Sequence, residues 1–398
     1  MIMVDQQMTQ FKRCLKNPEQ SFLLLGPRST GKSTWIDANI PSSLTIDLLE
    51  SDRFLDLSSR PSLLRQLASP LKKGDWIVID EIQKIPGLLD EVHWLYQKKN
   101  LRFAITGSSA RKLKQSQANL LAGRLLDIKF FPLVYPEFGD RFDLSDCLNF
   151  GCLPGLASSY KNPEGILSSY LSTYIRQELL EEAIIRKLDP FRRFIDAVGM
   201  INGQLLNKES IARESGVKRP TIDHYFGILE DTLMGGYLDA YCPGYKTKEV
   251  THPKFYLFDT GVVRACAGLL NQNLESDYLG FMFETFILAQ LRAYLSYNFK
   301  YFPIYHYSIS GSYDIDFVVM TKKPVMAKMG SFVNIEVKYG SKFRPDWLKG
   351  LKDFKSIAHK QNVSSHIVYN GNDLMKLEDA TVWPVALFLQ ALFQGDIL

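Results

Sequence analysis

Short apolar runs, each ending in polar residues, recur along the first third of the chain and alternate with stretches of helical periodicity. The runs are Phe22–Leu25, Leu44–Leu49, Asp75–Glu81 and Leu101–Thr106. Runs of this length are typical of buried strands, and helices are expected over 5–16, 62–68 and 110–117. Strand–helix alternation predicts a parallel sheet with helices on both faces. We therefore expect an α/β domain over residues 1–145.

The periodicity changes twice after residue 145. Helical spacing of apolar residues dominates residues 146–245, most clearly after Pro163, and predicts a helical connector. Residues 246–398 form a further predicted α/β domain. Its expected elements are a helix over 277–297, strands over 301–307, 313–319 and 332–338, a helix over 345–360 and a strand over 366–369. A chain of 398 residues is long enough for the two or three domains that these changes indicate.

A phosphate-binding loop follows the first predicted strand. The sequence GPRSTGKS has the spacing GxxxxGKS between a strand and a helix, and its glycines let backbone N–H groups face a polyphosphate. Lys32 would place its ammonium group on the β- and γ-phosphates, and the Ser33 hydroxyl would ligate Mg²⁺. The predicted nucleotide-binding residues are Gly26, Pro27, Arg28, Ser29, Thr30, Gly31, Lys32, Ser33 and Thr34. The loop predicts that the protein binds a nucleoside triphosphate.

An acidic pair ends the third predicted strand. Asp80 and Glu81 follow four apolar residues, and the carboxyl edge of a parallel sheet faces the metal ion in a phosphate-loop enzyme. Asp80 is therefore expected to hold Mg²⁺ through water, and Glu81 to activate the attacking water. The alternative is a strand that simply ends in solvated acids. The position of the pair, after the loop and in the same predicted sheet, favours the active-site interpretation.

Three further residues are candidates for sensing the γ-phosphate. Thr106 and Ser108 follow the fourth predicted strand and can orient the attacking water, although capping of the next helix explains Ser108 equally well. Arg124 is the one cation in the apolar stretch 119–127. It is expected either to neutralise charge near the γ-phosphate, from its own subunit or a neighbour's, or to pair with a local carboxylate such as Asp127.

Together these segments resemble the AAA+-like ATPase domain of a bacterial and archaeal family whose members join it to a C-terminal domain of unknown function. The segments are GPRSTGKS, VIDEIQKIP, ITGSSARKL, LLAGR and FFPLVYPEF, in this order between about residues 20 and 140. DEIQ at Asp80–Gln83 and LxGR at Leu121–Arg124 carry the likeness beyond the loop. The resemblance implies ATP binding and slow hydrolysis and leaves the physiological substrate undefined.

Residues 204–230 have the pattern of a helix-turn-helix. Ala212, Gly216 and Ile222 fall at the offsets of such a unit. If the second helix entered a DNA major groove, its forward face would be Lys218, Arg219, Thr221 and His224. Its low basic density and its acidic end leave a winged-helix unit used for packing or protein contact as an equal alternative.

Two predicted strands of the C-terminal part carry charged residues on one face. Asp314 and Asp316 share a face of one strand, and Glu336 and Lys338 share a face of the next. Carboxylates and a lysine on adjacent strands can hold Mg²⁺ and polarise water against a phosphodiester. The alternative is an ion pair in a sheet that catalyses nothing.

This pattern resembles the PD-(D/E)xK nuclease fold. Asp316, Glu336 and Lys338 occupy the matching positions, and Glu284 lies on the preceding helix, where some of those enzymes carry an extra acid. The FDTG segment and the E-x-K pattern also resemble the C-terminal domain of the ATPase family, so the likeness extends over nearly the whole chain. It is compatible with an active nuclease and with a scaffold that is idle or only binds.

Composition narrows the partners and the compartment. A net charge of +4, from 47 basic and 43 acidic residues, permits contact with DNA or RNA without arguing for it. The five cysteines are scattered and lack zinc spacing, so reduced thiols are expected. The chain shows no apolar signal segment and no run approaching about 18 apolar residues, which favours a cytoplasmic protein with no membrane partner.

Three functions remain open from the sequence. The first is an Mg²⁺-dependent ATPase acting as a nucleotide-driven switch on a C-terminal half that binds a partner: DNA or RNA, another protein, or a second copy of the chain. The second is an ATP-regulated, metal-dependent nuclease. The third is a nucleotide-dependent protein-interaction module with no nucleic-acid role. ATP and Mg²⁺ are the expected cofactors.

Overall fold

A computed structural model describes residues 11–110, 123–175, 188–242, 252–308, 314–325, 329–358 and 361–398. The chain divides into two compact units. The first comprises Met1–Leu133, Leu153–Gly155 and Gly227–Met234, and the second comprises Val134–Cys152, Leu156–Phe226 and Gly235–Leu398. The helix predicted over 110–117 lies, after its first residue, outside the described residues.

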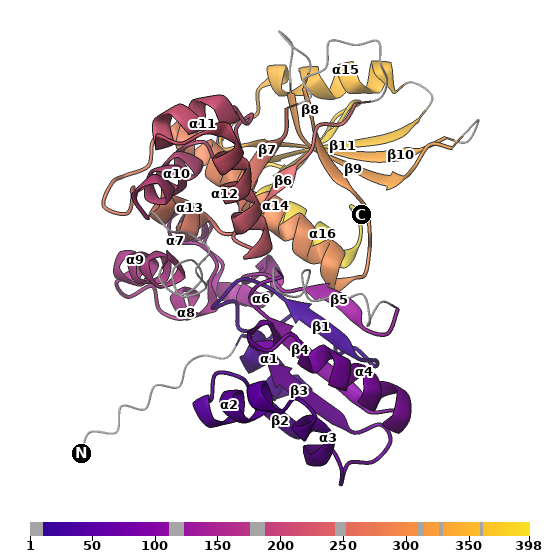
Figure 1. Cartoon of the computed structure of the whole chain (residues 1–398). Coiled ribbons are helices and arrows are strands. Elements are labelled where there is room, and N and C mark those ends of the chain that lie inside the picture. Colours follow the sequence, from indigo (N-terminus) through magenta and orange to yellow (C-terminus); the bar gives the residue numbers. More distant parts are fainter. Residues whose placement is uncertain are drawn as a thin grey trace. The chain divides into compact units, whose positions relative to one another are not determined.

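The first unit is built on a five-stranded parallel sheet with the order β2-β3-β4-β1-β5 (Figure 1). Its strands are β1 (Phe22–Leu25), β2 (Ser42–Asp47), β3 (Trp76–Asp80), β4 (Arg102–Gly107) and β5 (Leu126–Lys129). Every neighbouring pair is parallel, so the carboxyl ends of all the strands lie at one edge. Strand β4 lies between β1 and β3. The predicted parallel sheet is confirmed.

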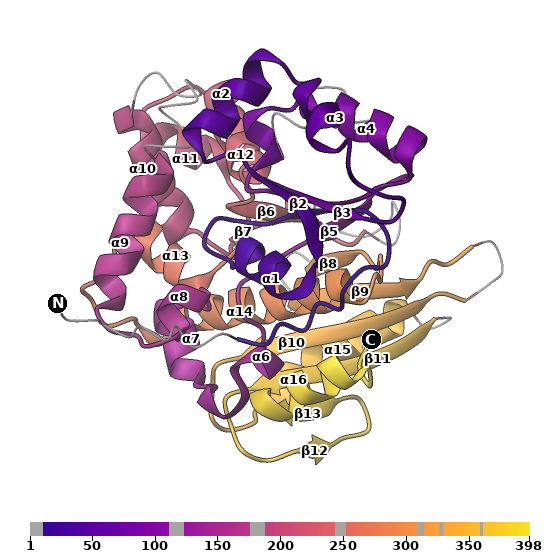
Figure 2. The ribbon, with the colours of Figure 1, turned by 90° about the horizontal axis from the view of Figure 1, so that it is seen from below.

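Helices cover both faces of this sheet, as Figure 2 shows. They are α1 (Lys32–Asn39), α2 (Ser51–Ser59), α3 (Leu63–Leu67), the 3-10 turn η1 (Ile82–Lys84) and α4 (Leu88–Lys99). Leu88, Val92 and Leu95 recur at helical spacing in α4 and are fully buried in one core with the sheet. On the other face, the Trp35 ring of α1 lies 6.1 Å from that of Phe22. The aromatic contact therefore holds α1 against β1, the two elements that flank the loop.

Helices form the first part of the second unit. They are α6 (Tyr135–Phe138), η3 (Gly139–Arg141), α7 (Leu144–Phe150), α8 (Pro154–Ala157, whose first two residues belong to the first unit), α9 (Pro163–Tyr174), α10 (Leu188–Met200) and α13 (Thr260–Cys266). Asp259 of the FDTG segment caps α13 by accepting the Val262 N–H at 3.2 Å, and its other oxygen accepts the Cys152 N–H at 2.7 Å. A Cβ atom on Gly261 would lie 2.2 Å from the Phe150 carbonyl oxygen. Packing and capping therefore explain the FDTG segment.

The predicted helix-turn-helix pattern forms α11 (Lys208–Ser215) and α12 (Arg219–Asp231). Gly216 ends α11 in the left-handed region with φ 67°, a conformation that glycine adopts without strain. An antiparallel pair follows, β6 (Gly235–Leu238) with β7 (Lys254–Leu257). The end of α12, from Gly227, belongs to the first unit.

The second unit also contains a six-stranded mixed sheet with the order β12-β13-β11-β10-β9-β8. Its strands are β8 (Ile304–Ser308), β9 (Asp314–Lys322), β10 (Ser331–Lys338), β11 (Asn362–Tyr369), β12 (Met375–Lys376) and β13 (Thr381–Pro384). Its helices are α14 (Ser276–Tyr297), η5 (Pro345–Leu348), α15 (Lys349–Ile357) and α16 (Val385–Gln394). Strand β10 pairs antiparallel with β9 and parallel with β11. Among the described residues, no helix combines the length and apolar character needed to cross a membrane.

Candidate functional site

The phosphate loop encloses the ammonium group of Lys32. Lys32 Nζ donates to the carbonyl oxygens of Gly26 at 2.8 Å and Pro27 at 2.9 Å, and the residue is buried. Gly31 precedes α1 with φ 88°, in the left-handed region. A Cβ atom on Gly26 would lie 2.3 Å from the Phe130 carbonyl oxygen, so this position has room only for glycine. The loop therefore presents a cation and backbone N–H groups at the start of α1.

Ser33 and Asp80 meet at the carboxyl edge of the sheet. Ser33 Oγ donates to Asp80 Oδ2 at 2.7 Å, across β4. The hydroxyl of Thr106, on β4, donates to the other carboxylate oxygen of Asp80 and accepts the Glu81 N–H at 3.0 Å. A hydroxyl and a carboxylate oxygen at this distance are the ligand types that Mg²⁺ prefers. The donor set present therefore fits a magnesium ion.

Glu81 is held beside Asp80 by two neighbours. Its backbone is left-handed, with φ 59°, which is uncommon for a residue other than glycine. The Glu81 carboxylate accepts hydrogen bonds from Ser108 Oγ at 2.8 Å and from the Gln83 amide, which also donates to Ser108 Oγ at 3.0 Å. The structure thus brings Asp80, Glu81, Thr106 and Ser108 together. Sequence reasoning gave Gln83 no role, although DEIQ contains it.

Arg13 supports the loop and was not anticipated from the sequence. Its guanidinium group donates to the Thr30 carbonyl at 2.7 Å and to the Phe131 carbonyl at 2.6 Å. It also lies 4.1 Å from the centre of the Phe130 ring. These contacts are made from an irregular segment, so the helix predicted over 5–16 is wrong for its described part, residues 11–16.

Arg124 lies at the other edge of the sheet. It occupies the turn before β5, and β5 pairs in parallel with β1 from Phe22↔Leu126 to Leu25↔Lys129. The turn is therefore separated from the phosphate loop by the length of the strand, about 13 Å. The structure does not bring Arg124 to the loop within one subunit.

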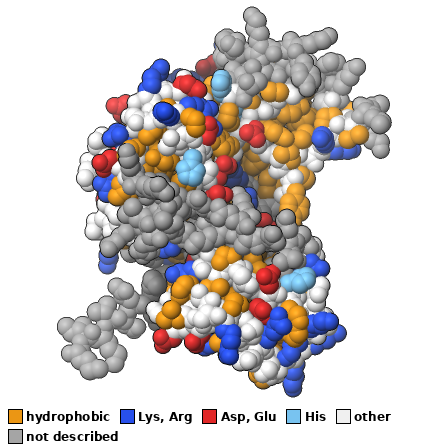
Figure 3. Space-filling model, viewed as in Figure 1, with side chains coloured by type: hydrophobic (Ala, Val, Ile, Leu, Met, Phe, Trp, Pro, Cys, Tyr) orange, Lys and Arg blue, Asp and Glu red, His pale blue; other side chains and the backbone are white. Residues whose placement is uncertain are grey.

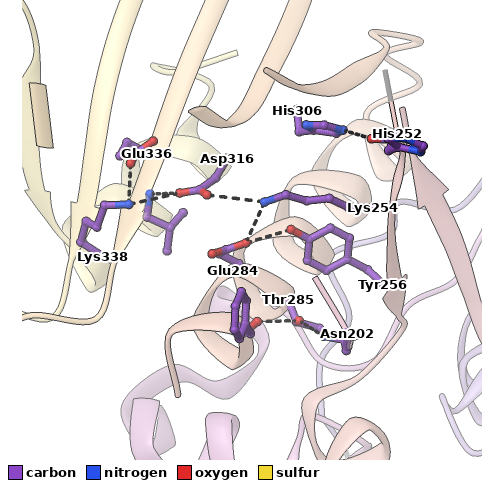
Figure 4. A network of polar contacts seen from close by, with 12 residues as sticks. Asn202, His252, Lys254, Tyr256, Glu284, Thr285, His306, Asp316, Glu336 and Lys338 are labelled. Carbon is purple, nitrogen blue, oxygen red and sulfur yellow. Dashed lines mark hydrogen bonds and ion pairs between the residues drawn. The ribbon is translucent and has the colours of Figure 1, made fainter. Parts of the chain in front are cut away.

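A second group of ionisable side chains gathers in the second unit (Figure 4). Asp316 on β9 lies at the centre of this group. Its Oδ2 atom accepts a hydrogen bond from the Val337 N–H at 2.7 Å and lies 4.0 Å from Lys338 Nζ. Lys338 Nζ also lies 2.5 Å from Glu336 Oε1. The other oxygen of Glu336 is buried and has no hydrogen-bond partner among the residues that the structure describes. The predicted residues Asp316, Glu336 and Lys338 therefore lie together on β9 and β10, whereas Asp314 is exposed.

Helix α14 and strand β7 complete this charge cluster. Glu284, predicted from the sequence, accepts a hydrogen bond from the Tyr256 hydroxyl at 2.9 Å. Lys254 Nζ lies 3.5 Å from the same Glu284 oxygen and 3.9 Å from Asp316 Oδ1. Lys254 and Tyr256 were missed from the sequence. The only available signal was a lysine inside the apolar stretch PKFYLF.

Burial perturbs the carboxyl groups of the cluster. Burial and the nearby Asp316 carboxylate raise the pKa of Glu336 to about 8, against the opposing effect of Lys338. The same two causes raise the pKa of Glu284 to about 7. Burial lowers the pKa of Lys338, but Asp316 and Glu336 outweigh it and the net shift is upward. At pH 7 the protonated form of Glu336 is thus favoured, and Glu284 titrates near neutral pH.

Two basic side chains of the helix pair α11–α12 form ion pairs with acidic neighbours. Arg219 pairs with Asp223 and lies 3.0 Å from Glu209 Oε1, and Lys208 lies 2.8 Å from Asp223 Oδ1. Hydrogen bonds from Arg219 and Lys208 hold the pKa of Asp223 below its usual range. Figure 3 shows basic and acidic side chains interspersed over these helices. Of the predicted DNA-facing residues, Lys218 and His224 are exposed and Arg219 is engaged with acids.

The parallel sheet and the GxxxxGKS loop are those of a P-loop ATPase-like domain, and the family comparisons agree. Residues 18–139 match the family described as "AAA domain". Residues 141–273 match "Domain of unknown function (DUF8612)", and residues 279–388 match "Domain of unknown function (DUF4143)". The predicted order, an AAA+-like ATPase domain followed by a C-terminal domain of unknown function, is confirmed.

The relatives of this chain are uncharacterized. Proteins of Mycobacterium tuberculosis and Mycobacterium bovis are each 26% identical over 306 residues, 75% of this chain and 67% of each relative. A protein of Haemophilus influenzae is 25% identical over 293 residues, 67% of this chain and 73% of that protein. Among solved structures, that of Can2 from Sulfobacillus thermosulfidooxidans in complex with cyclic tetra-adenylate aligns with 95% of this chain and 100% of that chain at 11% identity and a TM-score of 0.21. So low a score carries no argument.

Proposed function

We propose that this protein is an Mg²⁺-dependent ATPase whose nucleotide state controls a partner-binding C-terminal half. The observation that carries the proposal is the 2.7 Å contact between Ser33 Oγ and Asp80 Oδ2 at the end of a phosphate loop. Thr106 and Glu81 stand beside this pair. The match of residues 18–139 to an AAA domain supports ATP as the nucleotide.

Each side chain at this edge has its own task. With nucleotide bound, Lys32 would turn from the loop carbonyls to the β- and γ-phosphates, and Ser33 and Asp80 would hold the metal ion. When bound, Mg²⁺ supplies neutralisation of the phosphate charge. Thr106 fixes the Asp80 carboxylate, and Glu81, positioned by Gln83 and Ser108, accepts a proton from the attacking water. A contribution from Arg124 would come from a neighbouring copy of the chain.

Two substitutions test the proposal. Lys32→Ala should abolish nucleotide binding, because it removes the buried ammonium group that the loop carbonyls hold. Glu81→Gln should keep binding and lower turnover by about 100-fold or more. Binding is measured by titration with a fluorescent ATP analogue and turnover by phosphate release, with exposed Lys84→Ala as the matched control. Unimpaired hydrolysis in Glu81→Gln would remove Glu81 from the mechanism.

The surface of α11–α12 favours a protein partner over DNA or RNA. Two of its basic side chains, Lys208 and Arg219, are paired with acids, whereas a nucleic-acid surface keeps its cations for phosphates. We therefore infer a nucleotide-dependent protein interaction as the output. Affinity for DNA and RNA that is weak and flat across salt concentration supports this inference, and a steep salt dependence contradicts it.

The alternative, an ATP-regulated nuclease, is favoured by the meeting of Asp316, Glu336 and Lys338. It also requires a metal ion, and two lysines already flank the Asp316 carboxylate there. Incubation with DNA and RNA, Mn²⁺ and ATP decides between the two. Cleavage that both Asp316→Ala and Glu336→Ala lose would establish the nuclease.

A further inference from the structure

The charge cluster of the second unit contains one lysine more than the sequence pattern predicted. Three carboxyl groups, of Glu284, Asp316 and Glu336, face two ammonium groups, of Lys254 and Lys338 (Figure 4). Each ammonium group lies between two carboxyl groups. The two lysines therefore share the central Asp316, one on each of its oxygens.

The side chains of Lys254 and Lys338 differ in how easily they can move out of the charge cluster. The Lys338 side chain is 33% exposed, so it can turn toward solvent from the end of β10. The Lys254 side chain is 9% exposed. Its backbone is fixed because Lys254 pairs with Leu238 in the β6–β7 ladder and forms a bridge with Leu205 on its other side. Lys254 is thus a permanent part of the cluster.

The donor set around Lys254 does not suit a divalent ion. Both oxygens of Asp316 are engaged, Oδ1 by Lys254 and Oδ2 by the Val337 N–H and Lys338. Tyr256 and Lys254 occupy the same oxygen of Glu284. In the described part of the chain, no group of three or more His, Cys, Asp and Glu side chains is placed to hold a metal ion. Mg²⁺ sites need several oxygen ligands that converge on one point.

We propose that Lys254 is the resident cation of this cluster: its ammonium group holds the position between Glu284 and Asp316 and keeps divalent metal ions out. A fixed ammonium group gives the carboxylates the charge that a metal ion would otherwise supply. The cluster then joins β7 and α14 to the sheet without a cofactor. This inference is independent of the proposed ATPase, because it concerns the second unit alone.

Mn²⁺ binding without nucleotide tests the inference. All proteins carry Asp80→Asn, which removes the carboxylate ligand at the phosphate loop, and bound Mn²⁺ is measured by electron paramagnetic resonance. The parent should bind no Mn²⁺ that depends on Asp316. Lys254→Met keeps a long apolar side chain but no charge, so the competing cation is gone. It should bind Mn²⁺ through Asp316, at Mn²⁺ concentrations at least about tenfold below any at which the parent binds the ion.

The controls distinguish the loss of charge in Lys254→Met from a loss of folding. Lys352→Met removes an exposed lysine of the same unit, 3.2 Å from Asp379, and should bind no more Mn²⁺ than the parent. Circular dichroism checks that Lys254→Met is folded. If it folds and binds Mn²⁺ no better than the parent, Lys254 is not what excludes the metal. If the parent itself binds Mn²⁺ and loses it in Asp316→Asn, the inference is overturned without any Lys254 variant.

Discussion

Thr106→Val probes how the strand between the phosphate loop and Asp80 positions the metal ligand. Valine keeps the shape of this fully buried threonine, so packing is preserved. The substitution removes the hydrogen bond to Asp80 and leaves the Glu81 N–H without its acceptor at 3.0 Å. An unsatisfied buried donor costs about 1–3 kcal/mol. Residues that orient a metal ligand typically contribute about 10–100-fold to activity. We therefore expect kcat to fall by about 10–100-fold, equivalent to about 1.4–2.7 kcal/mol.

The assay separates the metal ligand from the nucleotide loop. ATP turnover is measured across Mg²⁺ concentrations, and the half-saturating Mg²⁺ concentration should rise in Thr106→Val. ATP affinity without Mg²⁺ should stay unchanged, because Lys32 and the loop are intact. Thr45→Val is the matched control, since Thr45 is exposed on β2 and its hydroxyl donates only to Ser42 Oγ at 2.9 Å among the hydrogen bonds described here. Wild-type turnover and an unchanged Mg²⁺ requirement in Thr106→Val would refute the reasoning.

Two further predictions concern the stability of the second unit. The pKa of Glu336, about 8, lies above its ordinary value of 4.5, so the folded state retains this proton while the unfolded state releases it. Its contribution to stability is therefore present at low pH and lost as pH rises from 4.5 to 8, by about 1.4 kcal/mol per pH unit at most. Urea unfolding at a series of pH values measures this loss. The free energy of unfolding should depend less on pH in Glu336→Gln than in the wild type. The same pH dependence in both proteins would contradict a raised pKa for Glu336. Asp259→Ala leaves two buried N–H groups without acceptors and should lower the free energy of unfolding by about 2 kcal/mol or more. Asp143→Ala removes an exposed cap with one N–H partner and should cost about 1 kcal/mol or less in the same urea experiment; equal losses would show that burial does not set the cost.

The first unit could be predicted from the sequence because its determinants are local. GxxxxGKS sets the turn, the helix start and the cation within eight residues. The parallel sheet then follows from strand–helix alternation, and the parallel strands carry Asp80 and Thr106 to the edge that holds Ser33. In the second unit, alternation along β9 and β10 likewise placed Asp316 beside Glu336 and Lys338.

The remaining features depend on contacts that no local pattern encodes. Arg13 binds carbonyl groups more than one hundred residues away, at Phe131, and its segment follows those contacts instead of a helical period. Arg124 belongs to a recognisable motif. Only the register of β5 against β1 shows that it lies at the amino end of β5, opposite the carboxyl ends of the strands where the phosphate loop lies. Lys254 lies in an apolar strand, and its partners come from α14 and β9.

The carboxylates of β9 and β10 also matter to the chain before it has folded. Both strands, DIDFVVMTK and SFVNIEVK, contain apolar residues that favour pairing with strands of other chains. Until β7 brings Lys254 to them, Asp316 and Glu336 are hydrated charges within these segments. Such charges act as gatekeepers against intermolecular pairing during synthesis. We therefore expect the residues that are hardest to bury in the finished domain to protect its strands from aggregation before they fold.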